Sequence, residues 1–301
     1  MFGSTKHQYE MQDPLKQYPQ PKFPKQEQPK PGLARDMDPK PDHGEDSYKG
    51  LGRLEGRKAL VTGGDSGIGR AAAIAFAREG ADVAISYMPE EEADAQEVVA
   101  LIEKAGRKAY PIPGDLTSEN YCNDLVARAV KSLGGLDILC NVAGHMFAQE
   151  DIADLTTEAF DRTMKTNVYA LFWICKAAVP HMKPGSTIIN TASIQAYQPS
   201  AALLDYAVTK AANVNFTKGL ANQLAPKGIR VNVVSPGPIW TPIQPTGNYG
   251  PEKVAEMGAK VPLGRPGQPA ELASVYVLLA SQESSYITGE NFGITGGNPC
   301  P

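Results

Sequence analysis

Four side chains in the middle of the sequence have the types and the spacing that acid–base chemistry needs. Tyr206 and Lys210, in the stretch YAVTK, are four residues apart and would share one face of a helix. Ser193 precedes Tyr206 by thirteen residues, and Asn167 lies in an otherwise apolar helical stretch. Reduction of a carbonyl needs a hydride at carbon and a proton at oxygen, and a positioned tyrosine hydroxyl can give that proton.

This chemistry requires the pKa of Tyr206 to fall from its ordinary value of about 10. The ammonium of Lys210 favours the phenolate and should lower that pKa, and a shift of about three units corresponds to roughly 4 kcal/mol. In this scheme Ser193 holds the substrate oxygen, and Asn167 holds a water that links Lys210 to solvent. The alternative is an amphipathic helix with a packed tyrosine and an exposed lysine.

A glycine-rich turn supplies the context that favours the chemical interpretation. The stretch TGGDSGIG places Gly63, Gly67 and Gly69 between an apolar strand and a helix. Glycine lets the backbone approach a ligand closely, and a helix that begins there presents free N–H groups to a pyrophosphate. We therefore predict nucleotide binding by this turn, including its other members Asp65, Ser66 and Ile68.

The end of the second strand bears on the choice of nucleotide. An acid there would bind the ribose hydroxyls of NAD and repel the additional phosphate of NADP. The stretch AISYMPEEE places Tyr87 at that position, and its acids come later. Arg70 or Ser86 can then contact the phosphate, so the sequence favours NADP(H) and leaves NAD(H) possible.

Two further turns follow predicted strands at the edge where ligands bind in such sheets. Asp115, followed by Leu116, can accept a hydrogen bond from an adenine amino group. Asn141, Ala143 and Gly144, in NVAG, end the fourth strand with small residues that permit close approach of a cofactor.

The elements that must position these residues alternate between apolar strands and helices. The pattern predicts strands at 58–64, 82–87, 108–115, 136–144, 186–193, 229–237 and 291–297, with helices at 67–80, 91–106, 118–135, 157–182, 203–225 and 269–281. Nearly all-apolar strands in this alternation indicate a parallel sheet covered on both faces. We predict an α/β, three-layer, Rossmann-type doubly wound sheet of about seven strands in a single domain, residues 51–301.

Residues 1–50 have a different composition, with eight prolines and few aliphatic residues. This segment is either a disordered tail or an arm that lies on its own domain or on a neighbouring subunit, anchored by Tyr9, Tyr18 and Phe23. The net charge of -4 gives no indication of nucleic-acid binding. The cysteines and histidines lack metal-ligand spacing, so we expect no metal site. We also expect no membrane span and a cytoplasmic location.

Together these features resemble the short-chain dehydrogenase/reductase family over about residues 54–299. The resemblance implies an NAD(P)-dependent oxidoreductase of class EC 1.1.1.-, with Asn167, Ser193, Tyr206 and Lys210 as a catalytic tetrad. It also implies that Pro236, Gly237, Ile239 and Thr241, in RVNVVSPGPIWT, lie along the nicotinamide half of the cofactor. Most members are homotetramers that associate through two long helices and the last strand.

A nearer likeness is to the glucose and ribitol dehydrogenase homologues and related bacterial aldehyde reductases. It rests on TGGDSGIGRA, SIQAYQPS, LLDYA, GPIWTP and the proline-rich arm. One departure is Val142, where the family usually has an asparagine, and we expect altered local packing there.

The substrate pocket should form after the fourth, fifth and sixth strands. His145, Gln195 and Tyr197 are candidate substrate contacts, together with Met146, Tyr249 and a segment, 242–258, that can act as a lid. The sequence favours NADPH-linked reduction of aldehydes or small carbonyls. The alternatives are oxidation of a polyol or sugar and, in another class, a nucleotide-binding scaffold or sensor with little turnover.

Overall fold

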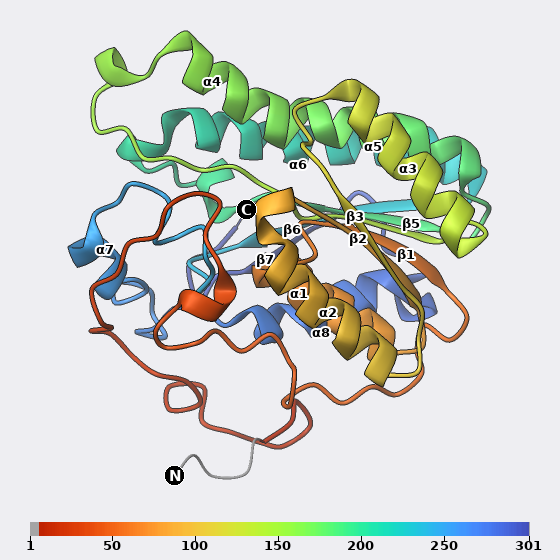
Figure 1. Ribbon diagram of the computed structural model, residues 1–301, viewed down its shortest axis with the longest axis horizontal. Coiled ribbons are helices and arrows are strands. Elements are labelled where there is room, and N and C mark those ends of the chain that lie inside the picture. Colours follow the sequence, from red (N-terminus) through yellow and green to blue (C-terminus); the bar gives the residue numbers. More distant parts are fainter. Residues whose placement is uncertain (1–5, 301) are drawn as a thin grey trace.

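The computed structural model describes residues 6–300, so the first five residues of the predicted arm lie outside the described residues. Seven parallel strands form one sheet in the order β3-β2-β1-β4-β5-β6-β7 (Figure 1). The strands are β1 (Lys58–Thr62), β2 (Asp82–Tyr87), β3 (Ala109–Pro113), β4 (Ile138–Asn141), β5 (Thr187–Thr191), β6 (Arg230–Pro236) and β7 (Asn291–Ile294). The predicted fold class is confirmed, with the strand order reversing between β1 and β4.

Helices cover both faces of this sheet (Figure 1). Helices α1 (Gly67–Arg78), α2 (Glu92–Lys104) and α8 (Pro269–Ala280) lie on one face. Helices α3 (Glu119–Leu133), α4 (Thr157–Met164), α5 (Ala170–Ala178) and α6 (Leu204–Leu224) lie on the other. A short helix, α7 (Pro251–Ala255), lies in the segment predicted as a lid.

The predicted helix at 157–182 is two α-helices rather than one. A π-helical turn, Lys165–Tyr169, joins α4 to α5 and contains Asn167. Turns of this kind inside helices are frequent at functional sites. Periodicity alone cannot reveal such a turn, since the apolar pattern continues through it.

The two largest clusters of the hydrophobic core lie one on each face of the sheet. Successive residues of β1 alternate between these clusters. Val61 belongs to the same cluster as Phe76, and Leu60 belongs to the same cluster as Leu139. All four are fully buried. Burying each such side chain contributes about 1.5–3 kcal/mol, which fixes the register and the position of each strand end.

The proline-rich segment packs against its own domain. The ring of Phe23 lies 4.4 Å from that of Trp240, and Trp240 Nε1 donates to the Pro39 carbonyl oxygen at 2.8 Å. Of the other predicted anchors, Tyr18 donates its hydroxyl to Asp42, and the largely exposed Tyr9 donates its hydroxyl to the Lys49 carbonyl oxygen at 3.2 Å. In Figure 1 this red-to-orange segment runs around the side of the molecule that carries α7 and α8.

Among residues 6–300, no helix has both the length and the apolar character that crossing a bilayer demands.

Candidate active site

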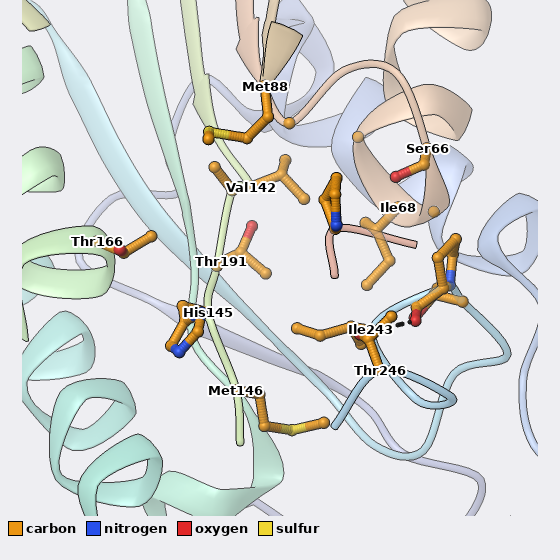
Figure 2. Close-up of a pocket in the computed structure, with 18 of the residues that line it drawn as sticks. Ser66, Ile68, Met88, Val142, His145, Met146, Thr166, Thr191, Ile243 and Thr246 are labelled. Carbon is orange, nitrogen blue, oxygen red and sulfur yellow. Dashed lines mark hydrogen bonds between the residues drawn. The ribbon is translucent and has the colours of Figure 1, made fainter. Parts of the chain in front are cut away.

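A cleft of about 390 Å³ opens at the carboxyl edge of the sheet, where the strand order reverses. Figure 2 shows Ser66 and Ile68 at the start of α1, Thr191 at the end of β5, and His145 and Met146 on the chain that follows β4. The volume lies within the range of about 300–1,000 Å³ that ligand pockets occupy. The cleft therefore has the place and size of a ligand site in a doubly wound fold.

The glycine turn forms one wall of this cleft because its backbone adopts conformations that side chains oppose. Gly63 and Gly67 have φ of 62° and 51°. A Cβ at Gly69 would lie 1.9 Å from the Gly63 carbonyl oxygen, which no rearrangement of side chains can relieve. Asp65, Ser66 and Ile68 line the cleft beside them. The glycines thus leave the backbone N–H groups at the start of α1 accessible from the cleft, as binding of a pyrophosphate requires.

The cleft beyond this turn contains two buried polar atoms without a hydrogen-bond partner among the described residues. These are Ser86 Oγ and Asp65 Oδ2. Buried polar atoms are normally paired, so atoms left free on a cleft wall indicate that a ligand supplies the partner. Tyr87 also lines the cleft, but its hydroxyl donates to Glu92 at 2.7 Å.

Arg70 does not take the position expected of a phosphate ligand. Its guanidinium lies 2.9 Å from Glu45 of the arm and 3.1 Å from Glu97 of α2, and it is not part of the cleft wall. The arm therefore holds this arginine on the far side of the turn. The prediction that Arg70 contacts a phosphate did not take Glu45 into account. Glu45 lies in residues 1–50, and the sequence did not determine where that segment packs.

Two carboxyl groups instead lie at this end of the cleft. Burial raises the pKa of Asp65, and burial together with the nearby Asp65 raises the pKa of Glu91. The pair holds protons at a pH where exposed carboxyls have lost them. Such groups bind hydroxyls well, and once ionised they oppose a phosphate.

Most of the remaining predicted cofactor residues line the same cleft. They are Asp115, Leu116, Ala143, Gly144, Pro236, Gly237, Ile239 and Thr241. Asn141 does not: its amide donates to Asn190 at 2.9 Å beneath the sheet edge. Val142 lines the cleft, and its backbone N–H donates to Thr62 Oγ1 at 3.0 Å. The bare glycine turn and the free polar atoms fit a dinucleotide held by these residues.

Ser193, Tyr206 and Lys210 meet on the wall of the cleft, although they come from β5's end and from α6. Lys210 is buried, and its Nζ donates to the Thr191 carbonyl oxygen at 3.0 Å. The same Nζ lies 5.3 Å from the centre of the Tyr206 ring. The face shared by positions 206 and 210 is therefore turned into the cleft.

The electrostatics of this pair differ from the expectation. Burial raises the pKa of Tyr206 to about 12, and the Ser193 hydroxyl opposes that rise only in part. Burial also lowers the pKa of Lys210 to about 8. The rise for Tyr206 is opposite to the predicted fall of the tyrosine pKa, because desolvation penalises the charged phenolate.

Asn167 lies behind the cleft and fixes the chain that follows β4. Its side-chain oxygen accepts from His145 N at 2.7 Å, and its Nδ2 donates to His145 O at 2.9 Å and to Thr209 Oγ1 at 3.0 Å. A small cavity of about 10 Å³ adjoins it. Asn141 and Asn213 line this cavity, and each leaves a buried Oδ1 without a partner.

The substrate end has fewer of the predicted residues. His145 and Met146 line the cleft with Pro242, Ile243, Gln244 and Thr246 of the predicted lid. Gln195 and Tyr197 lie outside the cleft wall, as does Tyr249. Gln195 turns back to accept from Ser200 N at 2.7 Å, and Tyr197 packs against the Ala192–Val233 cluster. Burial lowers the pKa of His145 to about 4, so it is neutral near pH 7.

Sequence reasoning missed Lys30, Pro31 and Arg162, all of which line the cleft. Arg162 lies in α4, five residues before the predicted Asn167, and no pattern in the sequence distinguishes it from the other charged residues of that helix. The same holds for Lys30, which reaches the cleft only because the arm folds back.

Comparison with known proteins gives a family model described as Enoyl-(Acyl carrier protein) reductase, which matches residues 63–298. The oxidoreductase YghA of Escherichia coli is 59% identical over 95% of this chain and 98% of its own. The glucose and ribitol dehydrogenase of Daucus carota is 44% identical over 85% of this chain and 89% of its own. The chloroplastic NADPH-dependent aldehyde reductase 1 of Arabidopsis thaliana is 44% identical over 83% and 88%.

A solved short-chain dehydrogenase from Burkholderia cenocepacia, in complex with NADP, has the same fold. It superposes with a TM-score of 0.76 at 38% identity, and the match covers 81% of this chain and 98% of the other.

Proposed function

Since the chain belongs to the short-chain dehydrogenase/reductase family and is an oxidoreductase, we propose that it reduces aldehydes or other small carbonyls with NADPH. The observation that carries the proposal is the convergence of Ser193, Tyr206 and Lys210 on one cleft with the glycine turn. The Arabidopsis relative, which is named as an NADPH-dependent aldehyde reductase, supports this substrate class.

The residues divide the work as follows. Tyr206 Oη gives a proton to the carbonyl oxygen in reduction and takes one from the alcohol in oxidation. Ser193 Oγ donates to the same substrate oxygen and holds it beside the tyrosine. The nicotinamide cofactor supplies or accepts the hydride. Lys210, half charged at about pH 8, favours the phenolate that Tyr206 leaves behind.

A small cavity behind the cleft bears on how the proton is returned. The small cavity beside Asn167 has about the volume that one water needs, and the free oxygens of Asn141 and Asn213 offer it partners. Asn213 also shares the Thr191 carbonyl oxygen with Lys210. We propose that a water in this cavity returns protons toward Lys210, while the Asn167 side chain itself serves to position His145.

Replacement of the tyrosine tests the reaction directly. We expect Tyr206→Phe to reduce kcat at least about a hundredfold, the lower end of what acid–base groups contribute, and to leave the dissociation constant of NADPH within about threefold. Tyr197→Phe is the matched control, because the Tyr197 hydroxyl is buried, makes no hydrogen bond among the described residues and lies off the cleft. Undiminished turnover by Tyr206→Phe would refute the mechanism.

The preference for NADP(H) over NAD(H) rests on the NADP-bound Burkholderia structure and on the free Ser86 hydroxyl. Asp65 and Glu91 work against it. As pH rises, these two carboxyls ionise and repel the additional phosphate, so the affinity for NADPH should fall relative to that for NADH. Dissociation constants of both cofactors at pH 6 and pH 8 test this, and tighter NADH at both values would reverse the preference.

The carrot relative, named a glucose and ribitol dehydrogenase, favours a second reaction. Oxidation of a polyol or sugar would use the same residues in the reverse direction. A panel of carbonyls and polyols, followed at 340 nm with both cofactors, separates the two. Failure of every substrate, with cofactor binding intact, would instead support a nucleotide-binding scaffold or sensor.

We also propose a homotetramer and a cytoplasmic location. Exposed apolar side chains occur on α4, the π-helical turn, α5 and α6: Phe160, Tyr169, Phe172, Leu204 and Val208. Exposed apolar side chains on these helices fit association with another copy of the chain. Light scattering of the purified protein tests the tetramer, and fractionation of the source cells tests the location.

A further inference from the structure

The arm contributes a turn to the active-site cleft. Within residues 28–33, the Gln28 side chain accepts from Leu33 N at 2.7 Å and donates to Leu33 O at 3.2 Å. These two hydrogen bonds join the ends of the turn. Lys30 and Pro31 lie between those ends and line the cleft. The position of Lys30 is therefore set by folded structure and not by a free tail.

The same turn is docked on the predicted lid segment. Gln28 N donates to the Pro245 carbonyl oxygen at 3.2 Å. Gly32 has φ of 76°, and a Cβ there would lie 2.5 Å from Thr246 Cγ2. Thr246 itself lines the cleft (Figure 2). The contact leaves room for glycine alone, so the arm and the lid close the substrate end together.

Two cations face the cleft at this end. The Lys30 ammonium lies 4.0 Å above the Phe147 ring, and Arg162 comes from α4. Within residues 6–300, neither has a carboxylate within 4 Å. The acid that acts on Lys30 is Asp205, which is buried and accepts from Thr163 Oγ1 and from Tyr206 N.

Repulsion among the cations that line this end of the cleft affects Lys30 and His145. The pKa of Lys30 falls to about 8, through partial burial first and repulsion by Arg162 second. The pKa of His145 is lowered by burial first, then by Lys30 and Arg162. Neutral His145 leaves two positive charges against the single negative charge of Asp205. An anion bound here would relieve the repulsion, and arginine offers it a forked pair of donors.

We propose that Lys30 and Arg162 bind an anionic group, a carboxylate or a phosphate, at the end of the carbonyl substrate remote from the reacting carbon. This deepens the proposed function and rests on it. The carboxyls of Asp65 and Glu91 lie at the glycine-turn end, so the two ends of the cleft differ in charge. The arm then contributes to substrate specificity as well as to the stability of the fold.

Matched substrate pairs test this. The pairs are 4-oxobutanoate against butanal for the carboxylate, and glyceraldehyde 3-phosphate against glyceraldehyde for the phosphate. We expect the anionic member of at least one pair to have a kcat/KM at least about tenfold higher, as one charge-assisted hydrogen bond can supply. Lys30→Gln should lower the anionic-to-neutral ratio about tenfold through KM, as should Arg162→Gln.

Lys40→Gln is the matched control, because Lys40 is an exposed arm lysine that is not part of the cleft wall. It should leave the ratio unchanged. An equal loss for both members of a pair in Lys30→Gln would overturn the proposal, as would a preference for the neutral members in the wild type. A raised KM for the cofactor alone would assign Lys30 to the cofactor instead.

Binding without turnover separates this inference from the proposed function. Calorimetry compares butanoate with butan-1-ol on the protein with NADP, in the wild type and in Lys30→Gln. Tighter binding of butanoate that is lost in the variant supports the anion site even if no aldehyde is reduced. Equal binding by wild type and variant refutes the anion site even if aldehydes are reduced.

Discussion

Burial acts on Tyr206 and Lys210 in opposite directions, and in both cases it favours the neutral side chain. In the proposed mechanism, Tyr206 gives up a proton from a phenol whose pKa is about 12. The Lys210 ammonium, 5.3 Å from the ring centre, stabilises the phenolate more strongly in this buried site than it would at the surface. Burial of that charge also destabilises the folded protein.

Lys210→Met should consequently raise stability near neutral pH while abolishing turnover. The pKa of Lys210 is about 8 in the folded protein and about 10.4 in an unfolded chain, so folding removes a proton between those values. Its charge destabilises the fold below pH 8, and the penalty fades as pH rises toward 10. Denaturant unfolding should show a gain of about 2–3 kcal/mol at pH 7, smaller at pH 10.

Lys218→Met provides the comparison on the same helix, since Lys218 is exposed. It should alter the unfolding free energy by less than about 0.5 kcal/mol. A Lys210→Met variant that is less stable than wild type at pH 7 would contradict the assigned cost of the buried ammonium.

At the scale of elements, the junction of β1 with α1 places the helix start against the cleft. The connection between β1 and α1 is tight because Gly69, in the first turn of α1, packs against the Gly63 carbonyl group with no space for a Cβ. The π-helical turn at Lys165–Tyr169 has a comparable role between α4 and α5. It brings Asn167 onto the His145 backbone, which holds the chain after β4 in place.

Gly69→Ala should therefore destroy nucleotide binding. The new Cβ would lie 1.9 Å from a backbone oxygen, so the turn must open. We expect a loss of about 1–3 kcal/mol in unfolding free energy, as overpacking typically costs, and no cofactor binding at millimolar concentration. Fluorescence titration with NADPH measures the binding.

The same substitution at Gly219 in α6 is a control with the opposite expected sign. Nothing lies within 4 Å of a Cβ built there, so Gly219→Ala should stabilise the helix by about 0.8–1 kcal/mol. Wild-type affinity for NADPH in Gly69→Ala would show that the turn does not approach the nucleotide as proposed.

For the molecule as a whole, the arm ties together parts that are distant along the chain. Phe23 packs on Trp240, Glu45 pairs with Arg70, and Tyr48 donates to the buried Glu79 at 2.6 Å. The pKa of Glu79 is lowered to about 2 by its hydrogen bonds to Arg53 and Tyr48, which outweigh the opposing effect of burial. The arm thus contacts the domain beside the glycine turn, at the buried Glu79 and beside the substrate end of the cleft.

Loss of one anchor should loosen the arm and the substrate end together. Phe23→Ala should destabilise the protein by about 2–4 kcal/mol and shift the emission of the buried Trp240 to longer wavelength. Met11→Ala, at a side chain that is 98% exposed, should do neither. If emission and stability are unchanged in Phe23→Ala, the arm does not pack on the folded domain through Phe23.

Deletion of residues 1–45 asks whether the arm also joins subunits. Because Phe23, Glu45 and Tyr48 of the arm pack on their own domain, we expect the shortened protein to lose thermal stability and to keep its oligomeric mass. Light scattering and thermal unfolding measure the two. A smaller oligomer would assign the arm a second contact, on a neighbouring subunit.

The sequence by itself determined the sheet, the glycine turn and the meeting of Ser193, Tyr206 and Lys210. Apolar periodicity gives the strands, and parallel strands bring their carboxyl ends to one edge, so residues that follow different strands must come together. Even the face shared by positions 206 and 210 follows from helical geometry.

Only the tertiary structure decided which charges meet in the cleft. Glu45 of the arm holds Arg70 away from the cleft wall, whereas Lys30 and Arg162 both line it, through contacts between the arm and the domain that no local pattern encodes. The direction of the Tyr206 pKa was likewise set by burial, which depends on every element packed around that hydroxyl. Local spacing fixes which side chains can meet, whereas desolvation and long-range pairing fix their charge.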